Sequence, residues 1–187
     1  MNMIDICNRV AGWNALRYDR VYNHDLAIAL LREEYRETVE AVETVDALDG
    51  LCDTIYVALG VLWKCNIPTE EWEHDEKEAI KFVENFVGPH IQPVFLIGAV
   101  IDACECDNDF PVALAMHAII LLARAQLSLM KLPLDAHVEA LSIVCDANDL
   151  KSVMKTPAHI KAAVDKGDKF VSPEAKLQAL LEKYNAA

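Results

Sequence analysis

The chain has 187 residues, of which 53% are hydrophobic, and its formal net charge is −13. A chain of this size can bury a sizeable core, so we expect one domain over residues 1–187. The acidic balance argues against a nucleic-acid polymer as partner, because such binding depends on Lys and Arg contacts to phosphates. Glycine and proline are sparse, with 6 and 7 residues, which favours helices over an all-β fold.

Helical periodicity and capping signals predict an all-α chain. The second expected helix follows Asn23, a plausible N-cap, and places Val39 and Val42 on its inward face. The third stops before Pro68, because proline disfavours helix in the residue that precedes it. No alternation typical of a strand extends beyond a few residues. The expected helices cover residues 2–16, 24–43, 46–65, 70–87, 92–105, 111–131, 135–146, 149–154, 157–165 and 173–184.

Cysteine usage and hydropathy bear on the cellular setting. The six cysteines show no spacing typical of a disulfide framework, and the sequence shows no signal-peptide pattern. We therefore expect free thiols in a cytoplasmic protein. The longest apolar run, residues 112–123, is too short to span a bilayer. We expect it to form a buried core helix, and we expect no membrane partner.

Four acidic residues lie at helical spacing on the second and third expected helices: Glu34, Glu37, Asp49 and Asp53. Steps of three or four residues keep two side chains on one helix face. If the two helices pack antiparallel, the four carboxylates converge, and their mutual repulsion requires a cation among them. Carboxylate oxygens suit Mg²⁺, which takes the rest of its ligands from waters and substrate phosphates. The spacing therefore indicates a metal-phosphate site.

A simpler interpretation is that this acidic run is the solvated face of an amphipathic helix. Against it, Asp49 and Asp53 interrupt the apolar segment 48–63. Aspartate is a poor residue for a helix interior, and a buried carboxylate needs a partner. From spacing alone, both interpretations remain open.

The run Glu33-Glu34-x-x-Glu37, followed by an acidic pair that opens an apolar helix, resembles the signature of the all-α nucleoside triphosphate pyrophosphohydrolases. This superfamily includes MazG-like proteins, phosphoribosyl-ATP pyrophosphohydrolases, dimeric dUTPases and dCTP pyrophosphatases. The usual motif has a Glu three residues before the final Asp, where this chain has Gly50. The segment from Asp49 to Asp53 instead resembles a phage and bacterial subgroup with an Asp-Ala-Leu-Ala-Asp-type helix.

A second match lies nearly a hundred residues later. Asn148-x-x-Lys151 resembles the Asn-x-x-Lys element that follows the bundle in the same subgroup, and residues 165–174 resemble its closing Lys-Gly-x-x-Phe-x-x-Pro segment. The resemblance covers residues 1–66 and 140–187. The competing structural interpretation makes Asn148 the N-cap of a helix at 149–154 and Lys151 a solvated side chain.

The resemblance implies a MazG-like four-helix core with extra C-terminal helices. It also implies a homodimer that hydrolyses an NTP or dNTP to the monophosphate and pyrophosphate with Mg²⁺ or Mn²⁺, a nucleotide-pool housekeeping reaction. Glu34, Glu37 and Asp53 would bind the metal, and Asp49 would act as ligand or base. Glu33, about 100° around the helix from Glu34, would orient water or a neighbouring helix.

Substrate contacts are expected from two places in the chain. Asn148 would hydrogen-bond phosphate or sugar, and Lys151 would answer the phosphate charge. Trp13, Asn14 and Tyr18 are candidates for a base pocket, although core packing explains the aromatic residues equally well. Two alternatives remain: a phosphoribosyl-nucleotide pyrophosphohydrolase, and a catalytically silent helical binding or assembly protein.

Overall fold

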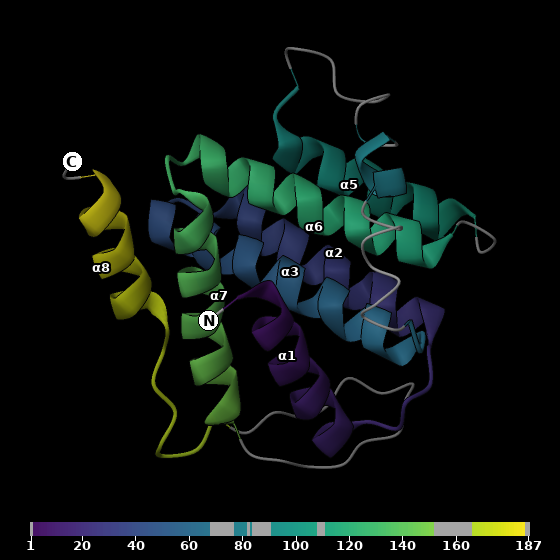
Figure 1. Cartoon of the computed structure of the whole chain (residues 1–187), viewed down its shortest axis with the longest axis horizontal. Helices are drawn as coiled ribbons and strands as arrows, with labels where there is room; N and C mark the ends of the chain where they lie inside the picture. Colours follow the sequence, from purple (N-terminus) through teal and green to yellow (C-terminus); the bar gives the residue numbers. More distant parts are fainter. Residues whose placement is uncertain are drawn as a thin grey trace.

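The computed structural model describes residues 2–67, 77–81, 83, 91–107, 111–151 and 166–185. Its named elements in these ranges are all helices, which confirms the all-α prediction (Figure 1). Residues 77–81 and 83 are also helical. The named helices are α1 (Met3–Arg17), α2 (His24–Glu40), α3 (Thr44–Lys64), α5 (Pro93–Cys106), α6 (Val112–Leu129), α7 (Leu134–Asp149) and α8 (Glu174–Asn185).

Four of these helices form a closed bundle. α2 packs on α3, α3 on α6, α6 on α5, and α5 back on α2. A second group, made of α1, α7 and α8, covers the other side of α3, with α1 and α7 side by side in front of it (Figure 1). The central helix α3 therefore has one side in the bundle core and another side against α1 and α7.

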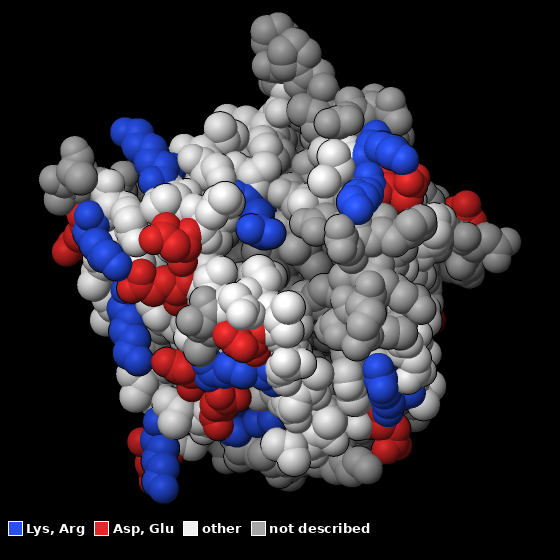
Figure 2. Space-filling model, viewed as in Figure 1, with Lys and Arg blue, Asp and Glu red and all other residues white. Residues whose placement is uncertain are grey.

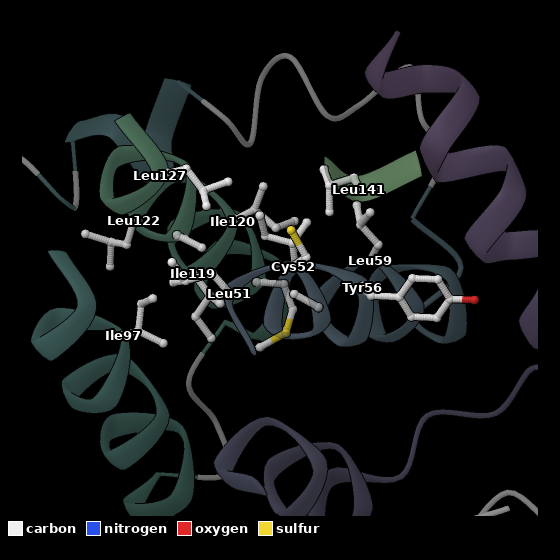
Figure 3. Close-up of a cluster of buried hydrophobic side chains, with 14 of the residues drawn as sticks. Leu51, Cys52, Tyr56, Leu59, Ile97, Ile119, Ile120, Leu122, Leu127 and Leu141 are labelled. Carbon is white, nitrogen blue, oxygen red and sulfur yellow. The ribbon is translucent and has the colours of Figure 1, made fainter. Parts of the chain in front are cut away.

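The bundle core lies between α3, α5 and α6. Figure 3 shows Leu51 and Cys52 of α3 close to Ile119 of α6 and Ile97 of α5, while the ring of Tyr56 extends away from the cluster. α6 is long and apolar enough, by length and composition alone, to cross a membrane. Half of this stretch is buried and it packs against both α3 and α5, as expected of a core helix.

Ion pairs join the second group of helices at the surface, where acidic and basic side chains lie side by side over α1, α7 and α8 (Figure 2). Arg9 of α1 contacts Asp146 at 2.9 Å and Asp149 at 2.5 Å, both on α7. Lys183 of α8 contacts Glu139 of α7 at 2.9 Å. Exposed pairs of this kind contribute little individually, about 0–1 kcal/mol, so the apolar contacts carry most of the packing energy.

Glycine at position 50 allows α2 and α3 to pack closely. A Cβ atom there would lie 2.5 Å from Oγ1 of Thr38 and 3.1 Å from its backbone N and Cα atoms. Because backbone atoms cannot give way as a flexible side chain can, a larger residue would force the helices apart. The chain therefore has no room at Gly50 for the Glu that occupies this position in the usual family motif.

Two expectations about helix bounds were wrong. α2 ends at Glu40, and the short connection to α3 leaves Val42 92% exposed and Val39 43% exposed, so neither faces inward. α7 continues to Asp149, which places Asn148 inside a helix. Asn148 is therefore not the N-cap of a helix at 149–154. The expected helix 157–165, most of 70–87 and residues 152–154 lie outside the described residues.

Candidate functional site

A cavity of about 310 Å³ opens between α1, α2, α3 and the end of α7. It is lined by side chains that are far apart in the sequence but that the sequence had singled out. These are Trp13, Asn14, Tyr18, Glu34, Asp53, Asn148 and Lys151. We call this cavity the α1–α3 pocket. Its volume lies at the lower end of the range typical of ligand sites, about 300–1,000 Å³.

The acidic residues reach this region from α2 and α3, which run antiparallel across the short connection 41–43. Glu34 and Asp53 both line the α1–α3 pocket. Glu37, one turn after Glu34, is exposed, yet its charge raises the pKa of both Asp49 and Asp53. The two acidic pairs are thus close enough to interact, as the antiparallel arrangement predicts.

Burial shifts the titration of the aspartate pair. It raises the pKa of Asp53 to about 7, with repulsion from Asp49 adding to it and Lys151 opposing it. It raises the pKa of Asp49 to about 6, and the nearby Glu174 at the start of α8 adds to this. Oδ1 of Asp49 is buried and has no hydrogen-bond partner in the structure's described part. A buried carboxylate oxygen without a partner is costly, and a cation would relieve that cost.

Residues of this kind suit a magnesium ion. Within the described ranges, no three Asp, Glu, His or Cys side chains lie close enough to hold a metal ion by themselves. Mg²⁺, however, is usually held by only one or two carboxylates, with waters and substrate phosphates as the other ligands. Glu34 and Asp53 can supply that pair from the pocket wall. The unpartnered oxygen of Asp49 lies one turn before Asp53 on α3 and adds negative charge beside that pair.

The Asn-x-x-Lys element lies at the end of α7 and is fixed by α1. Nζ of Lys151 donates a hydrogen bond to Oδ1 of Asn148 at 2.6 Å. Nε1 of Trp13 donates to the backbone carbonyl of Asn148 at 2.9 Å, and Nη2 of Arg17 donates to that of Lys151 at 2.8 Å. Lys151 is also close enough to Asp53 for the two charges to shift each other's pKa. The structure therefore brings this element to the acidic end of the pocket.

The closing segment of the chain brings a second cation to the same end. Nζ of Lys166 lies 4.9 Å from the centroid of the Phe170 ring, and Nζ of Lys151 lies 5.9 Å from it. The charge of Lys166 opposes the rise in the pKa of Asp53 and lowers the pKa of Lys151. A Lys-Gly-x-x-Phe pattern alone did not indicate that Lys166 would approach the acidic residues.

Aromatic rings form the other part of the wall. The ring centroids of Trp13 and Tyr56 are 5.7 Å apart in an edge-on arrangement, and those of Trp13 and Tyr18 are 6.4 Å apart. The guanidinium of Arg17 lies 3.9 Å from the centroid of the Trp13 ring. Trp13 and Tyr18 thus pack against neighbours and line the pocket at once, so the two interpretations of these aromatics are compatible.

Of the five predicted catalytic residues, Glu34 and Asp53 line the α1–α3 pocket and Glu37 and Asp49 lie one helical turn from them, whereas Glu33 lies on another face of α2. Glu33 lines a separate cavity of about 470 Å³, together with Arg32, Arg36 and Glu105. The 100° rotation between consecutive helical residues explains this separation from Glu34. The geometry gives Glu33 no direct place in the α1–α3 pocket.

Several pocket residues were not anticipated from the sequence: Tyr56, Val57, Gly60, Val61 and Lys64. All lie on α3 at steps of three or four from Asp53, so extending that helical face beyond the aspartates would have found them. Gly60 has a steric role, because a Cβ atom there would lie 3.1 Å from Nδ2 of Asn14. It lets the side chain of Asn14 lie directly on α3.

Comparison with known families gives one match. Residues 17–78 match the model of the family described as phosphoribosyl-ATP pyrophosphohydrolase. The match spans α2 and α3, which carry all four acidic residues, and it confirms for this part of the chain the resemblance to the all-α pyrophosphohydrolases. No curated protein and no solved structure matches the chain.

Proposed function

We propose that this chain, whose residues 17–78 match the phosphoribosyl-ATP pyrophosphohydrolase family, hydrolyses a nucleoside triphosphate to the monophosphate and pyrophosphate. One observation supports this most directly. A single pocket combines two carboxylates, Glu34 and Asp53, with the ammonium of Lys151 and with aromatic walls. Carboxylates suit a metal ion, an ammonium suits phosphate, and aromatic rings suit a nucleobase.

The acidic residues would bind the metal ion and accept a proton from the attacking water. Glu34 and Asp53 would hold Mg²⁺, with Glu37 and Asp49 supporting it from the adjacent turns. When bound, this ion would neutralise phosphate charge and lower the pKa of the attacking water. Asp49, whose pKa is about 6, is suited to take the proton from that water near neutral pH.

Lys151 would bind the phosphate chain as a point charge. Its hydrogen bond to Asn148 holds the ammonium in place before substrate arrives, which reduces the entropy lost on binding. Asn148 also lines the pocket, where its amide group can reach phosphate or sugar. The contacts from Trp13 and Arg17 to the backbone of this element keep it against α1.

The family match favours a second candidate substrate, a phosphoribosyl-ATP-type nucleotide. Its reaction also releases pyrophosphate from a triphosphate, so the acidic end of the pocket would act in the same way. The two candidates differ in what the far end of the pocket must accommodate.

A screen of pyrophosphate release tests the proposal. Purified protein should release pyrophosphate from at least one of the common NTPs and dNTPs, or from phosphoribosyl-ATP, with Mg²⁺ or Mn²⁺ present. A chelator should remove the activity and added metal should restore it, because the carboxylates repel the phosphates unless a cation lies between them. If no substrate released pyrophosphate, the remaining alternative would be a catalytically silent binding protein. Thermal shifts with each nucleotide would then identify its ligand.

We also propose a homodimer that uses the apolar surface around Phe95. Val39, Val42 and Phe95 line one cavity of about 380 Å³, and Phe95 is 57% exposed. Sedimentation at micromolar concentration should give a dimer for the native chain and a monomer for Phe95→Asp, because a buried unpaired charge disrupts an apolar interface. Ile4→Asp, at a residue 62% exposed on α1, is the matched control and should stay dimeric. A native monomer would refute the dimer.

A further inference from the structure

Lys64 is a buried lysine that the proposed chemistry does not use. It lies in the last turn of α3, is only 8% exposed and lines the α1–α3 pocket. Its Nζ atom lies 4.0 Å from the centroid of the Tyr18 ring. Among the described residues, no carboxylate, carbonyl or other acceptor pairs with this ammonium, and burial lowers its pKa.

Lys64 lies at the opposite end of the pocket from the acidic residues. The α3 face that lines the pocket runs from Asp53 through Tyr56, Val57 and Gly60 to Lys64. At a rise of 1.5 Å per residue, Asp53 and Lys64 are separated by about 16 Å of helix. If the phosphates lie at Asp53 and Lys151, Lys64 faces the end of the substrate that carries the base.

A second polar group at this end has unused hydrogen-bonding capacity. Asn14 is 5% exposed, and its Nδ2 donates to the backbone carbonyl of Val10 at 2.9 Å. Its Oδ1 accepts no hydrogen bond from any residue that the structure describes. Gly60 leaves the space in which this side chain lies against α3. Lys64 therefore offers donors, and Asn14 offers an acceptor, on the walls of the same narrow pocket.

The chemistry of an ammonium limits what Lys64 can recognise. It has three donors and no acceptor, so it requires an oxygen or a ring nitrogen with a lone pair. Uracil, thymine, cytosine and guanine each present an exocyclic carbonyl oxygen. Adenine offers ring nitrogens as acceptors, but an ammonium that approaches N1 or N7 also meets the exocyclic amine, which donates, so a carbonyl oxygen is the better match. A second phosphate at this end is less well matched, because one ammonium among Tyr18 and Val61 cannot balance a dianion that has lost its water.

We propose that Lys64 is a specificity-determining residue that donates a hydrogen bond to a carbonyl oxygen of the substrate base, so that the chain favours carbonyl-bearing nucleotides over adenine nucleotides. This inference rests on the proposed function for the placement of the phosphates. The simpler explanation is that Lys64 only interacts with the carbonyls at the C-terminus of α3. Such lysines normally extend into solvent, and this one is buried in the pocket wall.

The test compares substrate preference in three proteins: native, Lys64→Met and Lys64→Arg. Methionine has about the length and the apolar stem of lysine without its charge. We expect Lys64→Met to fold, because the buried ammonium has no ion-pair partner that the substitution would leave unpaired. We would measure kcat/KM for dUTP, dGTP, dATP and 2-aminopurine deoxyribonucleoside triphosphate, which resembles dGTP but lacks its carbonyl oxygen. The native chain should favour dUTP or dGTP over dATP by about ten- to a hundredfold.

In Lys64→Met, kcat/KM should fall by that factor for the favoured nucleotide and by less than about threefold for dATP, so that the preference disappears. Lys64→Arg should retain the preference. If Lys64 were purely structural, Lys64→Met would lower kcat/KM equally for all four nucleotides, and that outcome would overturn the inference. A native preference for dATP would also overturn it, and so would an effect of Lys64→Met confined to phosphoribosyl-ATP, which would indicate a distal phosphate.

A binding measurement separates this inference from the proposed function. Thermal shifts with UMP, GMP and AMP in chelator require neither metal nor hydrolysis. A larger shift with UMP or GMP than with AMP, abolished by Lys64→Met, would support the Lys64 inference even if no substrate were hydrolysed. Hydrolysis with the same base preference in native protein and Lys64→Met would leave the proposed function intact and refute the role of Lys64. Absence of both hydrolysis and binding would refute both.

Discussion

Asp53→Asn should abolish pyrophosphate release, lowering kcat/KM by at least about a hundredfold, because even residues that only support metal ligands cost ten- to a hundredfold when changed. Asp53 lines the α1–α3 pocket. The charge of Asp49 raises its pKa and the charge of Lys151 lowers it. Glu37→Gln should also reduce activity. Glu40→Gln, which neutralises an exposed carboxylate at the end of α2, is the control and should keep full activity.

Asp53→Asn should also stabilise the metal-free protein at neutral pH. The pKa of Asp53 is about 7 in the folded chain, against an ordinary value of 3.8. Between these values the folded state holds a proton that the unfolded chain has lost. The free energy of unfolding of the native chain in chelator should therefore fall as pH rises from about 4 to about 7.

Asparagine cannot ionise, so Asp53→Asn should escape this contribution to the decline. At pH 8 in chelator it should be more stable than the native chain by about 1–3 kcal/mol, and near pH 4 the two should be similar. Denaturant unfolding at the two pH values measures this difference. Full activity of Asp53→Asn would contradict the assignment of Asp53 as a metal ligand. A loss of stability at pH 8 would show that the folded protein does not disfavour the ionised carboxylate of Asp53.

Lys151→Ala should lower kcat/KM by about ten- to a hundredfold, equivalent to about 1.5–3 kcal/mol for a lost charge-assisted contact to phosphate. Its stability should change little, because its main side-chain hydrogen bond is to Asn148. Asn148→Ala should cost less activity, since it leaves the ammonium in place but less well oriented. Kinetics and melting curves of both variants provide the measurement.

Lys176→Ala is the matched control for this pair, because Lys176 is exposed on α8 and lies 4.0 Å from Asp146. Its activity should equal that of the native chain. If Lys151→Ala had the same kcat/KM as the native chain, the Asn-x-x-Lys element would not bind phosphate. An equal loss of activity in Lys176→Ala would show that general surface charge, and no specific contact, attracts the substrate.

Features set by local spacing could be predicted from the sequence. The helices, and the placing of Glu34 and Asp53 on facing sides of α2 and α3, follow from a period of 3.6 residues and a short connection. The interior position of Asn148 could not be predicted reliably, because helix ends are poorly determined by local signals and α7 continues to Asp149.

Features set by the distance between helices could not be predicted. Gly50 looked like a departure from the family motif, whereas the structure shows that α2 approaches α3 so closely there that no side chain fits. No pattern in the sequence singled out Lys64, which ends α3. Only the position of α1, which places Asn14 and Tyr18 across from it, shows that this lysine lies in the pocket.

The contacts between α1 and the end of α7 have a consequence for how the protein loses function. The lysine proposed to meet the phosphates is held through two backbone carbonyls, by Trp13 and Arg17, and through surface ion pairs of Arg9. None of these contacts belongs to the four-helix bundle, so we expect α1 and α7 to separate at a free-energy cost below that of global unfolding. Such an opening would remove Lys151 from the acidic residues while the bundle core remained folded. The temperature range of activity would then be set by this local separation, at temperatures where the helical content of the protein is still intact.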